Sequence, residues 1–459
     1  MNVSRDLDVR NAYARDASGL ELIPDAVARP TTIEEAVDLV RSAVADRTPI
    51  TAAGAQTSTT AASIVDRGVL LSMAAMAKTL DVDPVSLVAR VQPGVTVGAL
   101  NAQLAEMGLR FAPDPTSEHD ATIGGAIACN ASGARSLRYG PTRAHVRSVH
   151  LINGSGQLVH LRRPQLEKNT VGFFAAQDPV DWIVGSEGTL GVIVEAELSL
   201  VPLPAHELGL ALPFTGEHEA LAFVAAARER GDAAPVQRPQ CLEFFDESAL
   251  AIARDAVGGS WMQSAKALVY LEQAFEADEE TDAVLDRWLS LGEQFGVDAA
   301  DIAVYADAAA LRDARRFRHA VPAHMNERGS ARRPHGGRKV STDWAVPYRR
   351  LADALDSARR LADVHGVEQA VTYGHAGNGH PHQNFIANDA DELRQINGVV
   401  DETIAMVLGM GGTVAAEHGL GKLKRHWLRV QLSPAQLDVM QAIKNALDPL
   451  GLFAPGNVL

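Results

Sequence analysis

Cysteine is almost absent from this sequence, which has only Cys129 and Cys241 among its 459 residues. Two cysteines are too few to hold an iron–sulfur cluster and too few to build a disulfide framework. If the protein transfers electrons, they therefore need a carrier of another kind.

An excess of positive charge is also missing. The chain has 42 basic and 57 acidic residues, a net charge of -15, which opposes binding to nucleic acid or to an anionic membrane. No stretch approaches the length of an apolar membrane span, and the first twenty residues mix charges without an apolar core. We therefore expect a cytoplasmic protein that has no transmembrane segment and acts on a small molecule or a soluble partner.

The two common nucleotide-binding motifs are absent as well. The chain has neither the G-x-x-x-x-G-K-[ST] pattern nor a G-x-G-x-x-G fingerprint after its first strand. Instead, three segments rich in small and hydroxylated residues occur in its N-terminal half, at residues 52–60, 122–133 and 185–191. One such loop is weak evidence, since tight turns need glycine without any ligand. Three of them favour a dinucleotide whose diphosphate is held mainly by backbone amides.

Capping residues and hydrophobic spacing predict where the main helices begin and end. A helix is expected after Thr32, because this capping residue is followed by acids and by apolar residues on one face. A last helix is expected from the cap at Ser433 through Leu447. Further helices are predicted at residues 218–230, 277–295 and 347–364.

Short apolar runs predict strands, and a change of texture near residues 201–204 indicates a domain boundary. Beyond this point strands alternate with long amphipathic helices, which predicts helices packed on one face of an antiparallel sheet. The predicted strands lie at residues 48–51, 192–200, 266–271 and 368–373.

Histidines gather in the C-terminal half. Residues 374–382 contain His375, His380 and His382 among glycines, and Glu417-His418-Gly419 follows later in the chain. An isolated histidine is more often a hydrogen-bonded structural residue, but this clustering favours an active site. Imidazole and carboxylate groups are ligands that suit Zn²⁺ or Mn²⁺.

Five N-terminal motifs point to a known family. They are Pro30-x-Thr32-x-Glu34-Glu35, Asp114-Pro115 before Ile123-Gly124-Gly125, Asn130-Ala131-Ser132-Gly133, Tyr139-Gly140-x-Thr142-Arg143, and residues 184–191. With the histidine motifs and a closing Pro455-Gly456, the chain resembles the FAD-dependent D-2-hydroxy-acid dehydrogenases of the vanillyl-alcohol-oxidase/p-cresol-methylhydroxylase superfamily. Members of this kind act on D-lactate, glycolate or D-2-hydroxyglutarate. The resemblance spans nearly the whole chain.

The resemblance implies an α+β flavoprotein of two domains, with the active site between them. Residues 1–204 would form an FAD-binding domain of the p-cresol-methylhydroxylase type. Residues 205–459 would form a substrate (cap) domain, an antiparallel sheet covered by helices, with the segment 412–459 returning to the flavin.

The same resemblance implies that FAD is bound noncovalently. Members with covalent flavin often attach it to a histidine of the first phosphate loop, and residues 48–62 contain none. Gln56 stands where the family usually has a second glycine, and Cys129 is interpreted as a small buried thiol rather than a flavin attachment. The residues expected to bind FAD are Gly54, Ala55, Gln56, Thr57, Ser58, Pro115, Thr116, Ile123, Gly124, Gly125, Ala128, Asn130, Ser132, Gly133, Tyr139, Gly140, Glu187, Gly188, Gly191, Val192 and Ile193.

By family likeness, His375, His382 and Glu417 are the expected ligands of a Zn²⁺ or Mn²⁺ ion. Such an ion would act as a Lewis acid on the substrate hydroxyl, and His418 would accept the hydroxyl proton. His380 lies between two of these ligands, at a position where the family often has asparagine, and it is able to substitute for one of them.

Three further residues are expected to bind the substrate. Arg318 is the first choice for its carboxylate, because a guanidinium binds a carboxylate through two hydrogen bonds. Lys339 is the second choice, and Asn384 matches a family position that contacts substrate.

The expected reaction oxidises a D-2-hydroxy acid to the 2-oxo acid by hydride transfer to FAD. A quinone, an electron-transfer flavoprotein or a cytochrome would then reoxidise the flavin. Two alternatives stay open at this point: an oxidase that passes electrons to O₂, and a noncatalytic FAD-binding subunit of a larger dehydrogenase.

Overall fold

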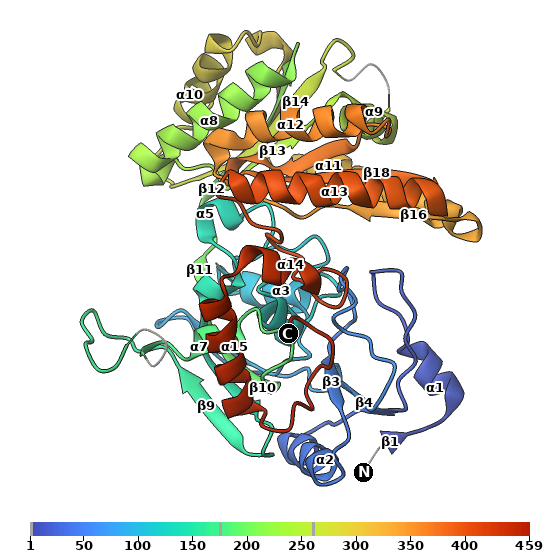
Figure 1. Cartoon of the computed structure of the whole chain (residues 1–459). Coiled ribbons are helices and arrows are strands. Elements are labelled where there is room, and N and C mark those ends of the chain that lie inside the picture. The colour runs from blue at the N-terminus through green and yellow to red at the C-terminus, as the bar shows by residue number, and fades with distance from the viewer. Residues whose placement is uncertain (1–2, 174–176, 259–261) are drawn as a thin grey trace. The chain divides into compact units, whose positions relative to one another are not determined.

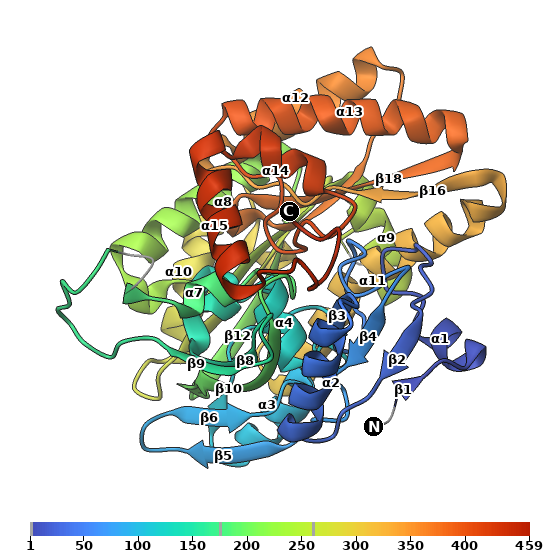
Figure 2. The same cartoon turned by 60° about the horizontal axis from the view of Figure 1, so that its bottom comes forward.

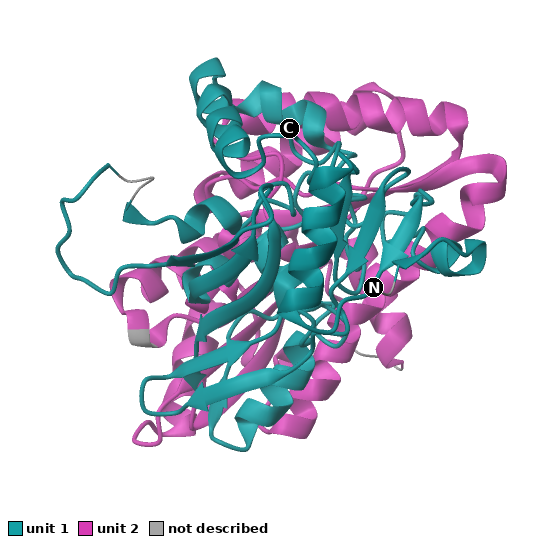
Figure 3. Ribbon diagram, turned by 90° about the horizontal axis from the view of Figure 1, so that it is seen from below, with its two compact units in different colours: residues 1–133, 140–203, 417–459 teal, residues 134–139, 204–416 magenta. Residues whose placement is uncertain are grey.

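The computed structural model describes residues 3–173, 177–258 and 262–459. These residues form two compact units, each with its own sheets and helices (Figure 3). Unit 1 comprises residues 1–133, 140–203 and 417–459, and unit 2 comprises residues 134–139 and 204–416. No helix within the described ranges is both long and apolar enough to cross a membrane.

Unit 1 begins with a small mixed sheet of four strands in the order β1-β2-β4-β3. α2 (Ile33–Ala45) packs on this sheet, as Figure 2 shows. The Thr32 side chain accepts a hydrogen bond from Glu35 N at its first turn, so the predicted start of this helix is confirmed. The strands are β1 (Val3–Ser4), β2 (Ala26–Ala28), β3 (Ile50–Ala53) and β4 (Val69–Ser72), and α1 (Leu7–Ala12) follows β1.

The second sheet of unit 1 is antiparallel, in the order β5-β6-β10-β8-β9. Its apolar side chains form a core with those of α3 and α4. α15 begins at Pro434, directly after the capping box at Ser433, and ends at Leu447, as predicted. The strands are β5 (Thr79–Asp83), β6 (Val88–Val91), β8 (Val146–Ile152), β9 (Leu158–Arg162) and β10 (Val192–Ser199); β7 (Leu109–Arg110) and β11 (Val201–Pro202) form a separate pair; the helices are α3 (Val97–Ala105), α4 (Ile123–Cys129), α7 (Val180–Ile183), α14 (Arg425–Gln431) and α15 (Pro434–Leu447).

The segment 122–133, expected as a loop, contains the helix α4 instead. Thr122 caps it by accepting a hydrogen bond from Gly125 N, and it ends at Asn130 in the left-handed conformation, with φ of 51°. Gly124 is needed for packing, because a Cβ there would lie 2.6 Å from the Cβ of Pro93. The glycines of this segment led to the expectation of a loop, since glycine is a poor helix former on its own.

Unit 2, whose main helices and several of whose strands are labelled in Figure 1, is built on one antiparallel sheet of seven strands. The strand order is β15-β12-β14-β13-β17-β18-β16. The strands are β12 (His206–Phe214), β13 (Cys241–Phe245), β14 (Ala267–Phe275), β15 (Ala303–Tyr305), β16 (Gly336–Ser341), β17 (Val371–His375) and β18 (His380–Asp389). The helices are α8 (Glu217–Ala233), α9 (Glu247–Val257), α10 (Thr281–Gln294), α11 (Ala308–Arg332), α12 (Leu351–Val364) and α13 (Ala390–Gly409), with the short α5 (Ser136–Tyr139).

Helices cover both faces of this sheet, so the prediction of one covered face is wrong. α9 and α11 pack on the face that carries Tyr270 and Tyr373. The other helices, α8, α10, α12 and α13, lie against the opposite face or against one another. The reason is in the strands themselves: every residue of β13 and of β14 is buried, and a sheet with two apolar faces needs a cover on each.

Candidate active site

Three histidines project from the same face of the sheet in unit 2. β17 and β18 pair antiparallel with His375 opposite His380 and Tyr373 opposite His382. Residues that face each other across a strand pair, and every second residue along a strand, share one face. The three imidazole rings are therefore neighbours, with centroids 4.6 to 5.5 Å apart.

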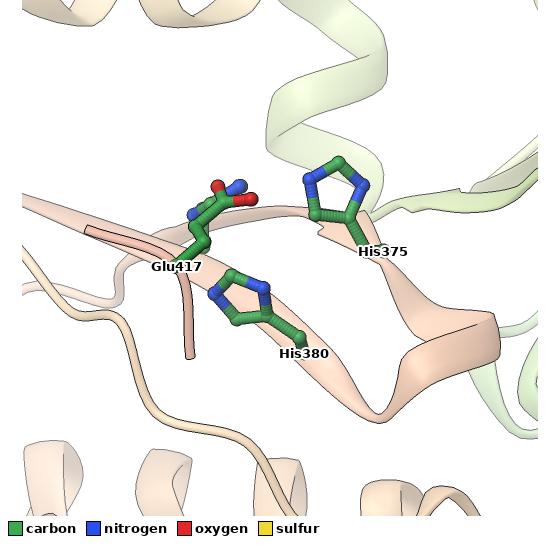
Figure 4. A group of neighbouring side chains, drawn as sticks. His375, His380 and Glu417 are labelled. Atoms are coloured by element: carbon green, nitrogen blue, oxygen red, sulfur yellow. The ribbon is translucent and has the colours of Figure 1, made fainter. Parts of the chain in front are cut away.

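Together with Glu417, these histidines form a group that is able to hold a metal ion. One ligand atom from each of the four residues lies within 4.8 Å of the others, and all three histidines are buried. Figure 4 shows His375, His380 and Glu417 gathered in one place. Glu417 directly follows Ala416, the last residue of unit 2, whose amide donates a 2.7 Å hydrogen bond to the carbonyl of Asp343. The three predicted ligands are thus together, and His380 lies with them.

A buried carboxylate that the sequence did not indicate fixes the orientation of His375. Glu243 in β13 accepts a hydrogen bond from His375 Nδ1 at 2.6 Å and another from Arg318 Nε at 2.7 Å. Burial alone would raise the pKa of Glu243, but the charge of Arg318 and the hydrogen bonds donated by His375 and Arg318 hold that pKa well below its usual value. Since the ionised carboxylate accepts the Nδ1 proton, the lone pair of His375 is on Nε2, the nitrogen able to bind a cation.

Arg318, predicted to bind the substrate carboxylate, is held by α11 against this pair. Besides its ion pair with Glu243, its Nη2 lies 3.4 Å from His375 Nδ1. Glu243 therefore neutralises part of the charge of Arg318 inside unit 2. Arg318 also helps to position His375.

Lys339 and Asn384 lie on the histidine face of the same sheet. In the pairing of β16 with β18, Lys339 faces Ile386 and Ser341 faces Asn384, two residues beyond His382. Neither Oδ1 nor Nδ2 of the buried Asn384 has a hydrogen-bond partner among the described residues. The ammonium group of Lys339 donates to Asn326 Oδ1 at 2.5 Å, and burial lowers the pKa of Lys339 to about 8. Unsatisfied amide atoms and a cation with a neutral partner are groups that suit a polar, anionic ligand.

Unit 1 brings the three small-residue segments into contact. Gly54 lies against the cap of α4, where a Cβ on Gly54 would be 2.2 Å from Thr122 Oγ1. The amides of Gly185 and Glu187 donate to the carbonyls of Ile127 and Ala128 near the end of α4, at 3.0 and 2.8 Å. Residues 52–60 and 185–191 therefore both border α4.

The backbone N–H groups of the first segment are available to donate hydrogen bonds to a ligand. From Gly54 to Thr59, no N–H group donates a hydrogen bond to another group in the described ranges of the chain. Gln56, which stands where a glycine was expected, has φ of 57°, and its side-chain amide donates to the carbonyls of Tyr13 and Ser63. Consecutive backbone N–H groups that donate to no protein acceptor are suited to bind the diphosphate of FAD.

The other predicted FAD residues also lie in unit 1, with one exception. Val192 and Ile193 begin β10, and Ser132 Oγ donates to Glu417 Oε2 at 3.3 Å. Tyr139 belongs to unit 2, where its hydroxyl donates to Gln240 Oε1 at 3.3 Å.

His418, the predicted base, is held by the segments of unit 1. Its carbonyl accepts from Thr60 Oγ1 at 3.4 Å, and its Nε2 lies 3.5 Å from Glu417 Oε1. Just beyond it, the amides of Leu420 and Gly421 each donate to the Glu187 carboxylate at 2.7 Å. Burial nevertheless raises the pKa of Glu187. The turn after His418 is thus anchored on two of the predicted FAD segments.

Two family models match this chain. Residues 24–162 match the model of the FAD binding domain, and residues 203–458 match that of the C-terminal domain of FAD linked oxidases. The D-lactate dehydrogenase of Archaeoglobus fulgidus is 30% identical over 437 residues, which cover 94% of this chain and 91% of that protein.

Two other relatives are similar over almost their whole length. The glycolate oxidase subunit GlcD of Bacillus subtilis is 29% identical, covering 98% of this chain and 92% of that protein. The D-2-hydroxyglutarate dehydrogenase of Stutzerimonas stutzeri is 28% identical, covering 99% and 96%.

A solved structure of alkyldihydroxyacetonephosphate synthase has the same fold. It matches with a TM-score of 0.73 at 18% identity, covering 99% of this chain and 82% of that one. The predicted α+β flavoprotein fold is therefore confirmed. The chain belongs to the FAD-linked oxidases of the vanillyl-alcohol-oxidase/p-cresol-methylhydroxylase superfamily, and it is an FAD-linked oxidoreductase.

Proposed function

We propose that this protein oxidises a D-2-hydroxy acid to the corresponding 2-oxo acid. The observation that carries the proposal is the buried group of histidines with Glu417, on a sheet face that also presents Lys339 and the unsatisfied amide of Asn384. These groups match the parts of a 2-hydroxy acid: a hydroxyl to deprotonate and a carboxylate to bind. Three relatives, named for D-lactate, glycolate and D-2-hydroxyglutarate, support the same class of substrate.

We assign the cofactor to unit 1, where residues 54–58 and the segments around α4 would hold FAD. FAD supplies the acceptor for hydride when it is bound. The attachment is noncovalent in this proposal, because residues 48–62 contain no histidine. Burial, with the charges of Glu187 and Asp16, raises the pKa of the Cys129 thiol to about 12, so this thiol is a poor nucleophile for flavin.

We assign the metal to His375, His382 and Glu417. A divalent cation such as Zn²⁺ or Mn²⁺ would supply Lewis acidity at this position. The donor set fits, because Glu243 leaves the lone pair of His375 on Nε2, and because both histidines are buried and Glu417 is half-buried.

The remaining roles belong to side chains of this chain. His418 accepts the hydroxyl proton as the substrate loses hydride from its α-carbon, which together yield the 2-oxo acid. Lys339 binds the substrate carboxylate, because its charge has a neutral partner, whereas Arg318 shares its charge with Glu243 and also positions His375. Asn384 donates to and accepts from the substrate's oxygens.

The proposal is tested by mixing the purified flavoprotein without oxygen with D- and L-lactate, glycolate, and D- and L-2-hydroxyglutarate. At least one D-acid should bleach the visible absorbance of the flavin, and its L-enantiomer should not. If none of these acids reduces the flavin, the proposed substrate class is wrong.

We further propose that the electrons pass to a quinone, an electron-transfer flavoprotein or a cytochrome. With two cysteines, the chain has no cysteine set for an iron–sulfur cluster. Peroxide measured per substrate oxidised in air should be far below one; a ratio near one would identify an O₂-dependent oxidase instead.

A further inference from the structure

We propose that His380 is an additional ligand of the cation, so that this chain binds its metal through three imidazoles and Glu417. The inference rests on the proposed metal site and adds a residue to it. It also has a separate consequence: the site should prefer ions that favour nitrogen ligands, such as Zn²⁺ and Co²⁺, over Mn²⁺.

The first support is position. The turn before β18 fixes which way His380 points, because Gly379 has φ of 68° and a Cβ there would lie 1.9 Å from the carbonyl of Val346. From this turn, His380 emerges directly opposite His375 and two residues before His382. Its ring centroid is 5.5 Å from that of His375 and 4.6 Å from that of His382.

The second support is an unsatisfied atom. His380 is 3% exposed, and its Nε2 has no hydrogen-bond partner among the described residues. Asp343 Oδ1 is the nearest acidic atom, 3.3 Å away, but this contact lacks the geometry of a hydrogen bond. Buried polar atoms in folded proteins almost always have a partner. A cation bound in this group would give the imidazole of His380 a partner, because the imidazole would coordinate it.

The chemical consequence is a change in metal preference. Imidazole ligands favour Zn²⁺, Co²⁺ and Ni²⁺, whereas Mn²⁺ and Mg²⁺ favour carboxylate and water oxygens. A group with three imidazoles and one carboxylate should therefore bind Zn²⁺ and Co²⁺ much more tightly than Mn²⁺. Removing one imidazole should reduce this preference.

The experiment uses the full-length flavoprotein after removal of its metals with a chelator. Co²⁺ is titrated while its visible absorption is recorded, and Zn²⁺ and Mn²⁺ affinities are measured by competition. The variants are His380→Asn, His382→Asn as a positive control, and His335→Asn as a negative control, since His335 is exposed. Circular dichroism of each metal-free variant checks folding, and His380→Gln replaces His380→Asn if the latter does not fold.

We expect His380→Asn to lower the affinity for Co²⁺ and Zn²⁺ by about tenfold or more, and to change the Co²⁺ spectrum. The Mn²⁺ affinity should change much less, and His335→Asn should behave as the wild type. If His382→Asn loses Co²⁺ binding while His380→Asn keeps the wild-type affinity and spectrum, the role of His380 is wrong and the proposed metal site stands. If the wild type itself binds none of the three ions, both are wrong.

Discussion

At the scale of single residues, Glu243 fixes the tautomer and orientation of His375, the proposed metal ligand. Its substitution Glu243→Gln removes the charge that orients His375 and leaves Arg318 without its buried partner. We expect a loss of about 3–5 kcal/mol in the free energy of unfolding, and metal binding that is weaker by about 10- to 100-fold. Denaturant unfolding and Zn²⁺ titration measure the two effects.

Glu229→Gln is the matched control for this substitution. Glu229 pairs with Arg349 at the surface, so its loss should cost about 0–1 kcal/mol and leave metal binding unchanged. Equal effects of the two substitutions would contradict the role given to Glu243.

The proposed role of Lys339 predicts how KM for the substrate depends on this side chain and on pH. Lys339→Met removes a charge-assisted hydrogen bond worth about 1.5–3 kcal/mol, so KM should rise about 10- to 150-fold with a smaller change in kcat. Because burial lowers the pKa of Lys339 to about 8, the ammonium is charged below that pH. The wild-type KM should therefore rise as pH increases through 8.

Steady-state kinetics between pH 6 and pH 9, roughly centred on this pKa, check both statements. The control is Lys266→Met, because Lys266 is exposed and lies outside the site. A KM in Lys339→Met that equals that of the control would exclude Lys339 as the residue that binds the substrate carboxylate.

Residue identities predicted part of the site and missed the rest for a physical reason. The clustering of histidines among glycines indicated an active site, and the family resemblance singled out His375, His382 and Glu417 as the expected ligands. Glu243 gave no such signal, since it is a single acid within the apolar strand β13, and only the pairing of β13 with β17 brings it to His375.

At the scale of elements, Asp246 links α9 to the histidine strand β17. Its carboxylate accepts from Ala249 N in the first turn of α9 and from Thr372 N in β17, both at 2.7 Å. Burial raises the pKa of Asp246 from 3.8 to about 7, although both hydrogen bonds oppose this shift. The folded state therefore binds the proton more tightly than the unfolded state.

The sign of the pH dependence follows from this raised pKa. The contribution of Asp246 to stability is greatest below pH 4 and is lost as pH rises from about 4 to 7, at no more than about 1.4 kcal/mol per pH unit. Asp246→Asn cannot ionise and should lack this component. We expect the free energy of unfolding of the wild type to fall relative to that of the variant over this range. Parallel curves from denaturant titrations at pH 4, 5, 6 and 7, which span roughly this window, would contradict it.

Helix starts were predictable from local chemistry, whereas the glycine-rich helix was not. Thr32 and Ser433 satisfy the first amides of α2 and α15 with their own side chains, so a few neighbouring residues suffice to predict these helices. In α4, glycines replace good helix formers because Pro93 leaves no space for a Cβ at Gly124. That constraint comes from a residue about thirty positions away, and local patterns do not contain it.

At the scale of the whole molecule, the fold and the family were accessible from sequence, and the second covered face of the sheet in unit 2 was not. Motifs spread along the chain predicted a two-domain flavoprotein, and the matches at residues 24–162 and 203–458 confirm it. Substrate choice depends on the shape of a pocket, which neither spacing nor a relative about 30% identical determines.

The central claim is that His418 accepts the hydroxyl proton of the substrate during its oxidation, and flavin reduction by substrate in the absence of oxygen tests it most directly. His418→Ala is compared with the wild type, with His426→Ala, a histidine of α14, as the control. We predict that His418→Ala keeps its FAD but is reduced by the preferred D-acid about 100- to 10,000-fold more slowly, while the control is reduced at the wild-type rate. Reduction of His418→Ala at the wild-type rate would contradict the account.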